Sequence, residues 1–442
     1  MIHSLVAALL TALIAWPAAA SAQDHFTRAL QVERDGEAVA TVRAACARCD
    51  WGQAGRESAA LVITLDGKYS QHLQLVRGET AADYHIALGH LSKGVHRLTI
   101  DRDPALTAPD AGPATIDVPD VSFSIPGQST DYPALSMAPI VYARPNTVGK
   151  FTDLPLLMWY EVVPTTRGRQ YRYSVIFSNE DGGTQTDRLM ATWGRTTDIE
   201  FIYGVEIDQA GRIVAEEFQG PGHEVPAFTG QHEGRHPLVW VSTDNNMVSE
   251  SGPTRIRYAP MAAKFDLTDV SREAVMDASP WTYAIASVEM RREGKVVDDV
   301  APGHNAIPDP RRFVYLEACG TIGNAALAVS IGSRQPQSAD LVWTASDRGL
   351  PQYRIVRDGC FRIATPLPAG TRAADIRAIR VQAFERPAAE GKPRVAANPV
   401  TFTRINKVFM LDEHDLPTPS VLSWQGSQTL RAGGEPFEVR IP

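Results

Sequence analysis

The sequence predicts a mainly β protein in which N-terminal and C-terminal β-sandwiches flank a central β-rich domain with one helix. Short runs of alternating apolar and polar residues fill most of the chain, and turns containing Gly or Asp separate them at short intervals. One stretch shows apolar residues at helical spacing, with a single apolar stripe. These observations favour packed sheets over a helical bundle.

Residues 1–22 have the composition of an export signal. An apolar Leu/Ala/Ile run is followed by Pro17 and by Ala20-Ser21-Ala22, the small-residue pattern at which signal peptidase cuts. We therefore expect cleavage before Gln23 and a periplasmic or secreted protein; an uncleaved anchor is the alternative. No later stretch approaches the ~18 apolar residues that a membrane helix needs.

Composition and missing motifs exclude several classes of function. The formal net charge is −8, and no dense Lys/Arg cluster occurs, so nucleic acid and anionic membrane surfaces are not expected partners. The sequence contains no G-x-S-x-G, G-x-G-x-x-G or G-x-x-x-x-G-K-[ST] pattern. A serine nucleophile elbow and the usual nucleotide-binding loops are therefore not predicted.

The four cysteines predict two disulfides, as is usual for an even number of cysteines in an exported chain. We pair Cys46 with Cys49 and Cys319 with Cys360, because each pair then lies within one predicted domain. A redox-active Cys-x-x-Cys at Cys46 is an alternative, although that motif normally opens a helix in a βαβ unit. A zinc site shared by all four thiols is the other alternative.

The first predicted domain, residues 23–125, has the texture of a small exported β-sandwich. Asp35-Gly36 and Asp66-Gly67 are hairpin signals, since both residue types tolerate positive φ. Three histidines on these strands are expected to be surface or packing residues, with metal binding as the alternative: His85, His90 and His96.

Proline-rich segments separate the predicted domains. The stretch 104–133 is predicted to be an extended linker. The central domain then covers residues 126–305, and its helix is predicted from Pro280 to Glu293, where apolar residues recur at i, i+3, i+4 and i+7 and Gly294 follows. A second linker-like segment at 301–312 leads to the C-terminal β-sandwich, residues 306–442.

The candidate catalytic residues are Asp198 and Glu200, two positions apart in a strand-like run. Period two places both carboxylates on one face, as acid–base chemistry on a glycosidic bond or a cation site requires. Trp193 and Tyr203 are candidate sugar-stacking residues beside them. The alternative is a solvated strand face on which Arg195 is the ion-pair partner.

Two further groups of residues are candidate cation ligands. The acidic loop 179–184, with Asp187, has oxygen donors suited to Ca²⁺, although a hairpin turn is favoured because the EF-hand pattern is absent. His223, His232 and His236 lie near Glu224 and Glu233, but their spacing matches no zinc template, and loop histidines without metal are favoured.

A single site follows only if the segment 223–246 closes over the carboxylates. In that case Asp198 or Glu200 is the natural oxygen ligand of a divalent cation held with the histidines. The other candidate binding residues on this segment are Trp240 and Asn245, on and just after a buried-looking strand.

The central domain resembles the eukaryotic vacuolar protein sorting family that carries an Asp-Trp-Glu motif. The matching features are Ala138–Tyr142, the aromatic strand Tyr171–Phe177, Asp198-Ile199-Glu200 and His236–Val241, with Ile199 at the position of the motif's tryptophan. The resemblance implies a fold more than a reaction. The whole chain otherwise looks like an uncharacterised family of exported bacterial β-rich proteins.

The sequence leaves two hypotheses of function. The first is an exported multidomain protein that binds a glycan or a component of the cell envelope, as the aromatic strands and missing catalytic motifs suggest. The second is a hydrolase or lyase that acts on an extracellular polysaccharide with Asp198 and Glu200, with or without a divalent cation.

Overall fold

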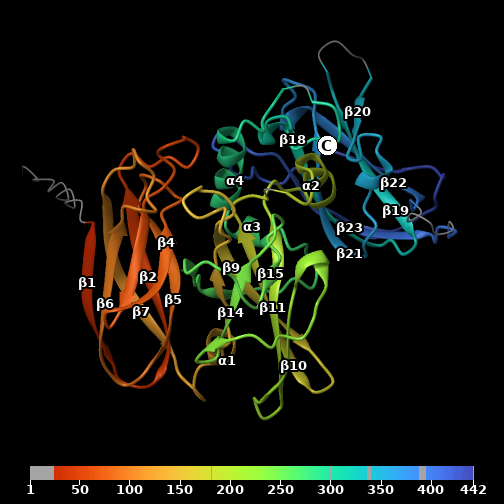
Figure 1. Cartoon of the computed structure of the whole chain (residues 1–442). Helices are drawn as coiled ribbons and strands as arrows, with labels where there is room; N and C mark the ends of the chain where they lie inside the picture. Colours follow the sequence, from red (N-terminus) through yellow and green to blue (C-terminus); the bar gives the residue numbers. More distant parts are fainter. Residues whose placement is uncertain (1–23, 181, 299, 336–339, 388–394, 442) are drawn as a thin grey trace, which may run out of the picture.

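The computed structural model describes residues 24–180, 182–298, 300–335, 340–387 and 395–441. The fold is mainly β and is built from several antiparallel sheets, which confirms the predicted class. Figure 1 shows strands β1 to β7 at one side of the molecule, the central part next to them and the C-terminal strands beyond it. The predicted export signal, residues 1–22, lies outside the described residues.

The N-terminal part is a sandwich of two antiparallel sheets, ordered β1-β6-β3-β4 and β5-β2-β7. Alternate strand residues such as Leu61 and Ile63 point into a shared core and are fully buried. The strands are β1 (His25–Val32), β2 (Gly36–Cys46), β3 (Ala60–Leu65), β4 (Lys68–Gln74), β5 (Ala82–Leu91), β6 (Gly94–Asp103) and β7 (Ala114–Ser124).

Two local predictions for this region are wrong. Residues 104–133 are not simply a linker, because β7 lies among them and pairs with β2 along its length. Asp35-Gly36 is not a hairpin turn, because β1 and β2 belong to different sheets. Asp66 and Gly67 do form the predicted hairpin turn, with φ of 52° and 76°, between β3 and β4.

The central part contains a larger sheet, β12-β11-β10-β9-β17, and a smaller one, β13-β14-β8-β16, with β15 paired to β14. Buried tyrosines and aliphatic side chains fill the core between them, including Tyr173, Tyr203 and Val239. The strands are β8 (Ile140–Tyr142), β9 (Pro155–Pro164), β10 (Gly168–Phe177), β11 (Ile199–Asp208), β12 (Ile213–Phe218), β13 (His232–Glu233), β14 (His236–Val241), β15 (Val248–Ser249), β16 (Arg257–Tyr258) and β17 (Ala262–Lys264).

The predicted helix is confirmed as α4 (Trp281–Arg292), and Gly294 follows it with φ 69°. Its packing differs from the prediction, because two faces are buried rather than one stripe. Ile285 packs into the N-terminal core, whereas Tyr283 and Met290 pack into a second cluster with C-terminal residues. Three shorter helices and one 3-10 turn in this region were not predicted: α1 (Tyr132–Ser136), α2 (Thr186–Trp193), α3 (Ala274–Ala278) and η1 (Pro221–His223).

The C-terminal part is a second sandwich, of sheets β21-β18-β23-β24 and β20-β19-β22-β25, around a separate apolar core. Its strands are β18 (Phe313–Thr321), β19 (Ala325–Ser333), β20 (Val342–Ala345), β21 (Gly359–Pro366), β22 (Ile376–Glu385), β23 (Val400–Phe409), β24 (Trp424–Leu430) and β25 (Phe437–Arg440), with 3-10 turns η2 (Pro310–Arg312), η3 (Pro351–Tyr353) and η4 (Ala373–Asp375).

Both predicted cysteine pairs are at bonding distance. Cys46 pairs with Cys49 in the N-terminal sandwich, and Cys319 pairs with Cys360 across the neighbouring strands β18 and β21. Because each cysteine is taken by its own partner, a zinc site of four thiols is not formed. A disulfide between adjacent strands fixes their register at that position.

The N-terminal sandwich docks on the central part through the edge of β5. The Ala87 amide donates to the Ala259 carbonyl over 2.8 Å, and the Met261 amide donates to the His85 carbonyl over 3.0 Å. The Trp51 indole also donates to the buried Glu289 carboxylate on α4. The exposed edge of one sheet is thus covered by another domain, which prevents edge-to-edge aggregation.

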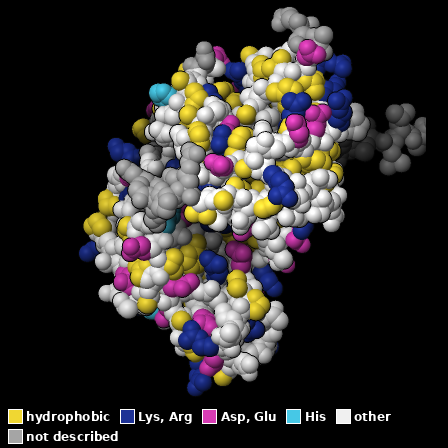
Figure 2. Space-filling view, turned by 90° about the vertical axis from the view of Figure 1, so that its right-hand side faces the viewer, with side chains coloured by type: hydrophobic (Ala, Val, Ile, Leu, Met, Phe, Trp, Pro, Cys, Tyr) yellow, Lys and Arg dark blue, Asp and Glu magenta, His cyan; other side chains and the backbone are white. Residues whose placement is uncertain are grey.

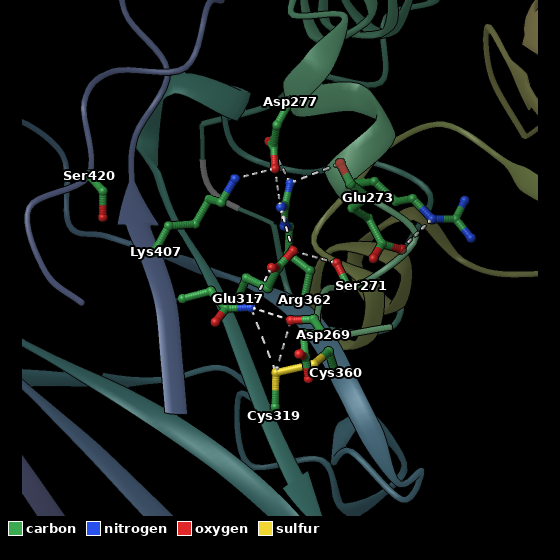
Figure 3. A network of polar contacts seen from close by, with 12 residues as sticks. Asp269, Ser271, Glu273, Asp277, Glu317, Cys319, Cys360, Arg362, Lys407 and Ser420 are labelled. Atoms are coloured by element: carbon green, nitrogen blue, oxygen red, sulfur yellow. Dashed lines mark hydrogen bonds and ion pairs between the residues drawn. A yellow bond between two sulfur atoms is a disulfide. The ribbon is translucent and has the colours of Figure 1, made fainter. Parts of the chain in front are cut away.

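A buried guanidinium joins the central and C-terminal parts (Figure 3). Arg362 on β21 has no exposed surface and donates to Glu317 on β18 over 2.8 Å and to Asp277 on α3. Ser271 donates to the same Glu317 carboxylate over 2.7 Å. The pairing of two carboxylates with one arginine compensates for the burial of charge between the two parts.

Candidate functional site

Asp198 and Glu200 lie at the start of β11 and share one buried site. Asp198 is 1% exposed and Glu200 is 9% exposed. The two side chains interact, which agrees with the common face predicted from the period-two spacing. The alternative of a solvated strand face is therefore wrong, although Arg195 does pair with Asp198 at 3.5 Å as that alternative expects.

A third carboxyl group, that of Glu180, completes the site from the loop between β10 and α2. Burial and the charge of Asp198 raise the pKa of Glu180 to about 8. The Thr184 amide donates to Glu180 Oε1 over 2.7 Å and holds the side chain in place. We call Glu180, Asp198 and Glu200 the carboxyl cluster.

Burial raises the pKa values of all three members of the carboxyl cluster. For Glu200 the pKa lies well above its ordinary value, because burial and the charge of Asp198 both favour the protonated form. Burial also raises the pKa of Asp198, but Arg195 and the hydrogen bond from Asn246 act in the opposite direction. Burial is the largest of these effects, so the pKa of Asp198 is raised despite Arg195 and Asn246.

Two amide side chains connect the carboxyl cluster to the segment that follows β12. Asn246, in the turn between β14 and β15, donates to Asp198 Oδ2 over 3.1 Å. Gln219 donates to Glu200 Oε2 and lies 3.4 Å from His223 Nδ1. Of the segment 223–246, Asn246 contacts Asp198 directly, whereas His223 contacts Gln219 and not the carboxylates themselves.

The structure does not bring the other predicted ligands to this site. His232 lies 2.8 Å from Glu216, and His236 lies 3.1 Å from Glu37 of the N-terminal sandwich. Asn245, a predicted binding residue, accepts a hydrogen bond from Thr243 instead. Within the described ranges, no group of three or more His, Cys, Asp and Glu side chains is arranged to hold a metal ion.

The remaining candidate histidines have local partners. His90 lies 3.5 Å from Glu37, so this one carboxylate contacts histidines from two domains. His96 pairs with Asp66 at 2.7 Å, and His85 contacts Thr41. These contacts agree with the surface and packing roles favoured from the sequence.

The acidic loop does not act as one ligand set. Glu180 turns inward to Asp198, whereas Asp187 at the start of α2 accepts from the Tyr353 hydroxyl over 2.7 Å. The Asn179 amide donates to Glu293 on the segment after α4. Asp181 lies outside the described residues. The donors expected for one Ca²⁺ therefore point to different neighbours.

The predicted aromatic residues do not form a common sugar platform. Tyr203 has no exposed surface, and its hydroxyl donates to Glu216. Trp193 is partly exposed, but guanidinium groups of Arg188, Arg195 and Arg357 lie within 6.0 Å of its ring. Trp240 stacks on Tyr142 with ring centroids 4.3 Å apart, in the smaller sheet.

The surroundings of the carboxyl cluster include charged groups that the sequence analysis missed. Arg144 pairs with Asp244 and with the buried Asp153, and Asp153 accepts from Asn246. Arg195 also pairs with Glu273 at 3.2 Å. These residues come from distant parts of the chain and follow no local spacing rule. Only the Asp244-Asn245-Asn246 run signalled a polar turn near the site.

Comparisons with known proteins leave the resemblance to the vacuolar sorting family a prediction. No family model matches the chain, and a search of curated proteins found no match. In the described part of the chain no helix is long and apolar enough to cross a membrane. On the face in Figure 2, Lys/Arg and Asp/Glu side chains are interspersed, without a large patch of one sign.

Proposed function

We propose that the carboxyl cluster is an acid–base site and that the exported protein is a hydrolase or lyase acting on an extracellular polysaccharide. The observation that carries the proposal is the burial of three interacting carboxyl groups: Glu180, Asp198 and Glu200 are 6%, 1% and 9% exposed. Buried carboxyl groups whose pKa values are raised by burial and by a neighbouring charge are typical of acid–base sites.

The roles follow from the contacts. Asp198 accepts a hydrogen bond from Asn246 and forms an ion pair with Arg195. Both interactions favour its carboxylate form, which suits it to act as a base. Glu180 keeps its proton at neutral pH and suits the role of acid. All three carboxyl groups are buried. The exposed residues nearest to them in the contact network are His223, which contacts Gln219, and Asp244, which pairs with Arg144.

The test is a panel of polysaccharides incubated with the purified protein, with and without Ca²⁺ or Mg²⁺. We expect release of reducing ends or unsaturated products, and a loss of about 10²- to 10⁴-fold in rate for Asp198→Asn and Glu180→Gln, the range for acid–base residues. Glu224→Gln, an exposed residue near the site, is the matched control. Full activity in the cluster variants would contradict the proposal.

Glycan binding without catalysis is the second candidate, and the stacked pair of Tyr142 and Trp240 favours it. Both rings are partly exposed, as a sugar-binding surface requires. In this case Trp240→Ala should weaken glycan binding in a pull-down or titration, while Asp198→Asn should not. The reverse pattern would support the acid–base site.

A further inference from the structure

A cavity of about 420 Å³ lies between the N-terminal sandwich and the central part. Strands β4 and β5 form one wall, and the start of β9, residues 258–265 and the first turn of α4 form the other. Neither Asp198 nor Glu200 lines it. Its volume falls in the range of ~300 to 1,000 Å³ that is typical of small-molecule sites, which often lie at domain interfaces.

The lining is mainly apolar, and its side chains do not fill the cavity. Large residues that are only partly buried surround the cavity, although elsewhere such residues fill the cores: Leu73, Leu156, Leu157, Phe265 and Trp281. Apolar surface that remains accessible inside a cavity gains free energy when an apolar molecule covers it. The cavity therefore favours an apolar occupant over water.

Charged groups lie only at the edge of the cavity. The Arg77 guanidinium stands 5.4 Å from the ring of Trp281, and Asp83 and His85 are exposed lining residues. The inner lining holds uncharged side chains, including the fully paired His72, which contacts Tyr69 and Asp103. A charge on the buried part of a ligand would therefore be left without a partner.

We infer that this cavity binds an uncharged, mainly apolar small molecule. The molecule covers the apolar surface of Leu73, Phe265 and Trp281. This site is separate from the carboxyl cluster and does not depend on the proposed catalysis.

The first test is a fluorescence titration with N-phenyl-1-naphthylamine, an uncharged and mainly apolar probe. We expect saturable binding of one equivalent with enhanced emission. Ala263→Phe, which fills the cavity, should weaken binding at least about tenfold, whereas Ala210→Phe at an exposed turn should leave it unchanged.

The second test reports occupancy without filling the cavity. Ser279 lines it, and the described residues include no free cysteine, so Ser279→Cys adds a single reporter thiol. We expect N-phenyl-1-naphthylamine to slow the reaction of this thiol with a disulfide reagent. Unsaturable emission, equal affinity in Ala263→Phe and Ala210→Phe, or an unprotected thiol would overturn the inference. If Ala263→Phe does not fold, the thiol protection decides.

Discussion

The side-chain amide of Asn246 donates to Asp198 over 3.1 Å and reaches Asp153 at 3.3 Å, so one amide connects two buried carboxyl groups. Asn246 has a φ of 54°, a backbone conformation that asparagine adopts more readily than most residues. Its position in the β14–β15 turn thus places a hydrogen-bond donor where the carboxyl cluster needs one.

Replacement of Asn246 should separate its backbone role from its side-chain role. Asn246→Gly keeps the positive φ and removes the donor, and we expect a loss of about 1 to 3 kcal/mol in the free energy of unfolding. Asn246→Asp keeps the size but adds a carboxylate beside Asp198 and Asp153, with a loss of roughly 3 to 5 kcal/mol at pH 7. Urea unfolding measures both. Equal losses for the two variants would contradict this account.

The raised pKa of Glu180 predicts a pH-dependent stability. Between the ordinary pKa of about 4.5 and the folded value of about 8, the folded protein holds a proton that the unfolded chain releases. The free energy of unfolding contributed by this group therefore falls as the pH rises through that window. Glu180→Gln should remove the effect and stabilise the protein by roughly 1 to 3 kcal/mol at pH 7, and by little at pH 4.

The measurement for Glu180 is thermal or urea unfolding of both proteins from pH 4 to pH 8. The exposed carboxyl group of Glu224 supplies the control, since Glu224→Gln should shift stability by less than about 0.5 kcal/mol throughout. Parallel stability curves for wild type and Glu180→Gln would show that this carboxyl group is ionised in the folded state.

Loss of Arg362 should strongly weaken the junction between the central and C-terminal parts. Arg362→Met leaves Glu317, which has no exposed surface, without its cation, and we expect a loss of about 3 to 5 kcal/mol. Adding Glu317→Gln to this variant should restore part of the lost stability, because it removes the unpaired buried charge. The surface variant Arg404→Met, which removes an exposed pair with Asp269, should cost less than about 1 kcal/mol. Similar losses in both arginine variants would count against a buried junction.

The two disulfides should contribute unequally to stability. In the chain-entropy model, closing the loop between Cys319 and Cys360 stabilises the fold by about 4 kcal/mol, whereas the loop between Cys46 and Cys49 contributes about 2 kcal/mol. Double Cys→Ala variants of each pair, compared by urea unfolding, test this order. A larger loss from the Cys46 pair would mean that native-state packing, rather than loop length, determines the effect.

The sequence predicted those parts of the fold that local patterns encode. Alternating apolar residues indicated the β class, the i, i+3, i+4, i+7 spacing located α4, and Asp66-Gly67 marked a hairpin. The helices that were not predicted, α1 to α3, have only five to eight residues. Each of them contacts residues of another domain, which no local pattern encodes. The Asp35-Gly36 prediction failed because a turn signal does not specify whether the next strand stays in the same sheet.

For the candidate site, the sequence by itself determined that Asp198 and Glu200 share a strand face, because that follows from the period of two residues. Only the tertiary structure decided their partners. In the folded protein Glu180 and Asn246 interact with Asp198, and the carboxyl cluster is buried. His232 instead contacts Glu216, and His236 contacts Glu37. These contacts join segments far apart in the chain, and burial, which sets the pKa values, exists only once the sheets have packed together.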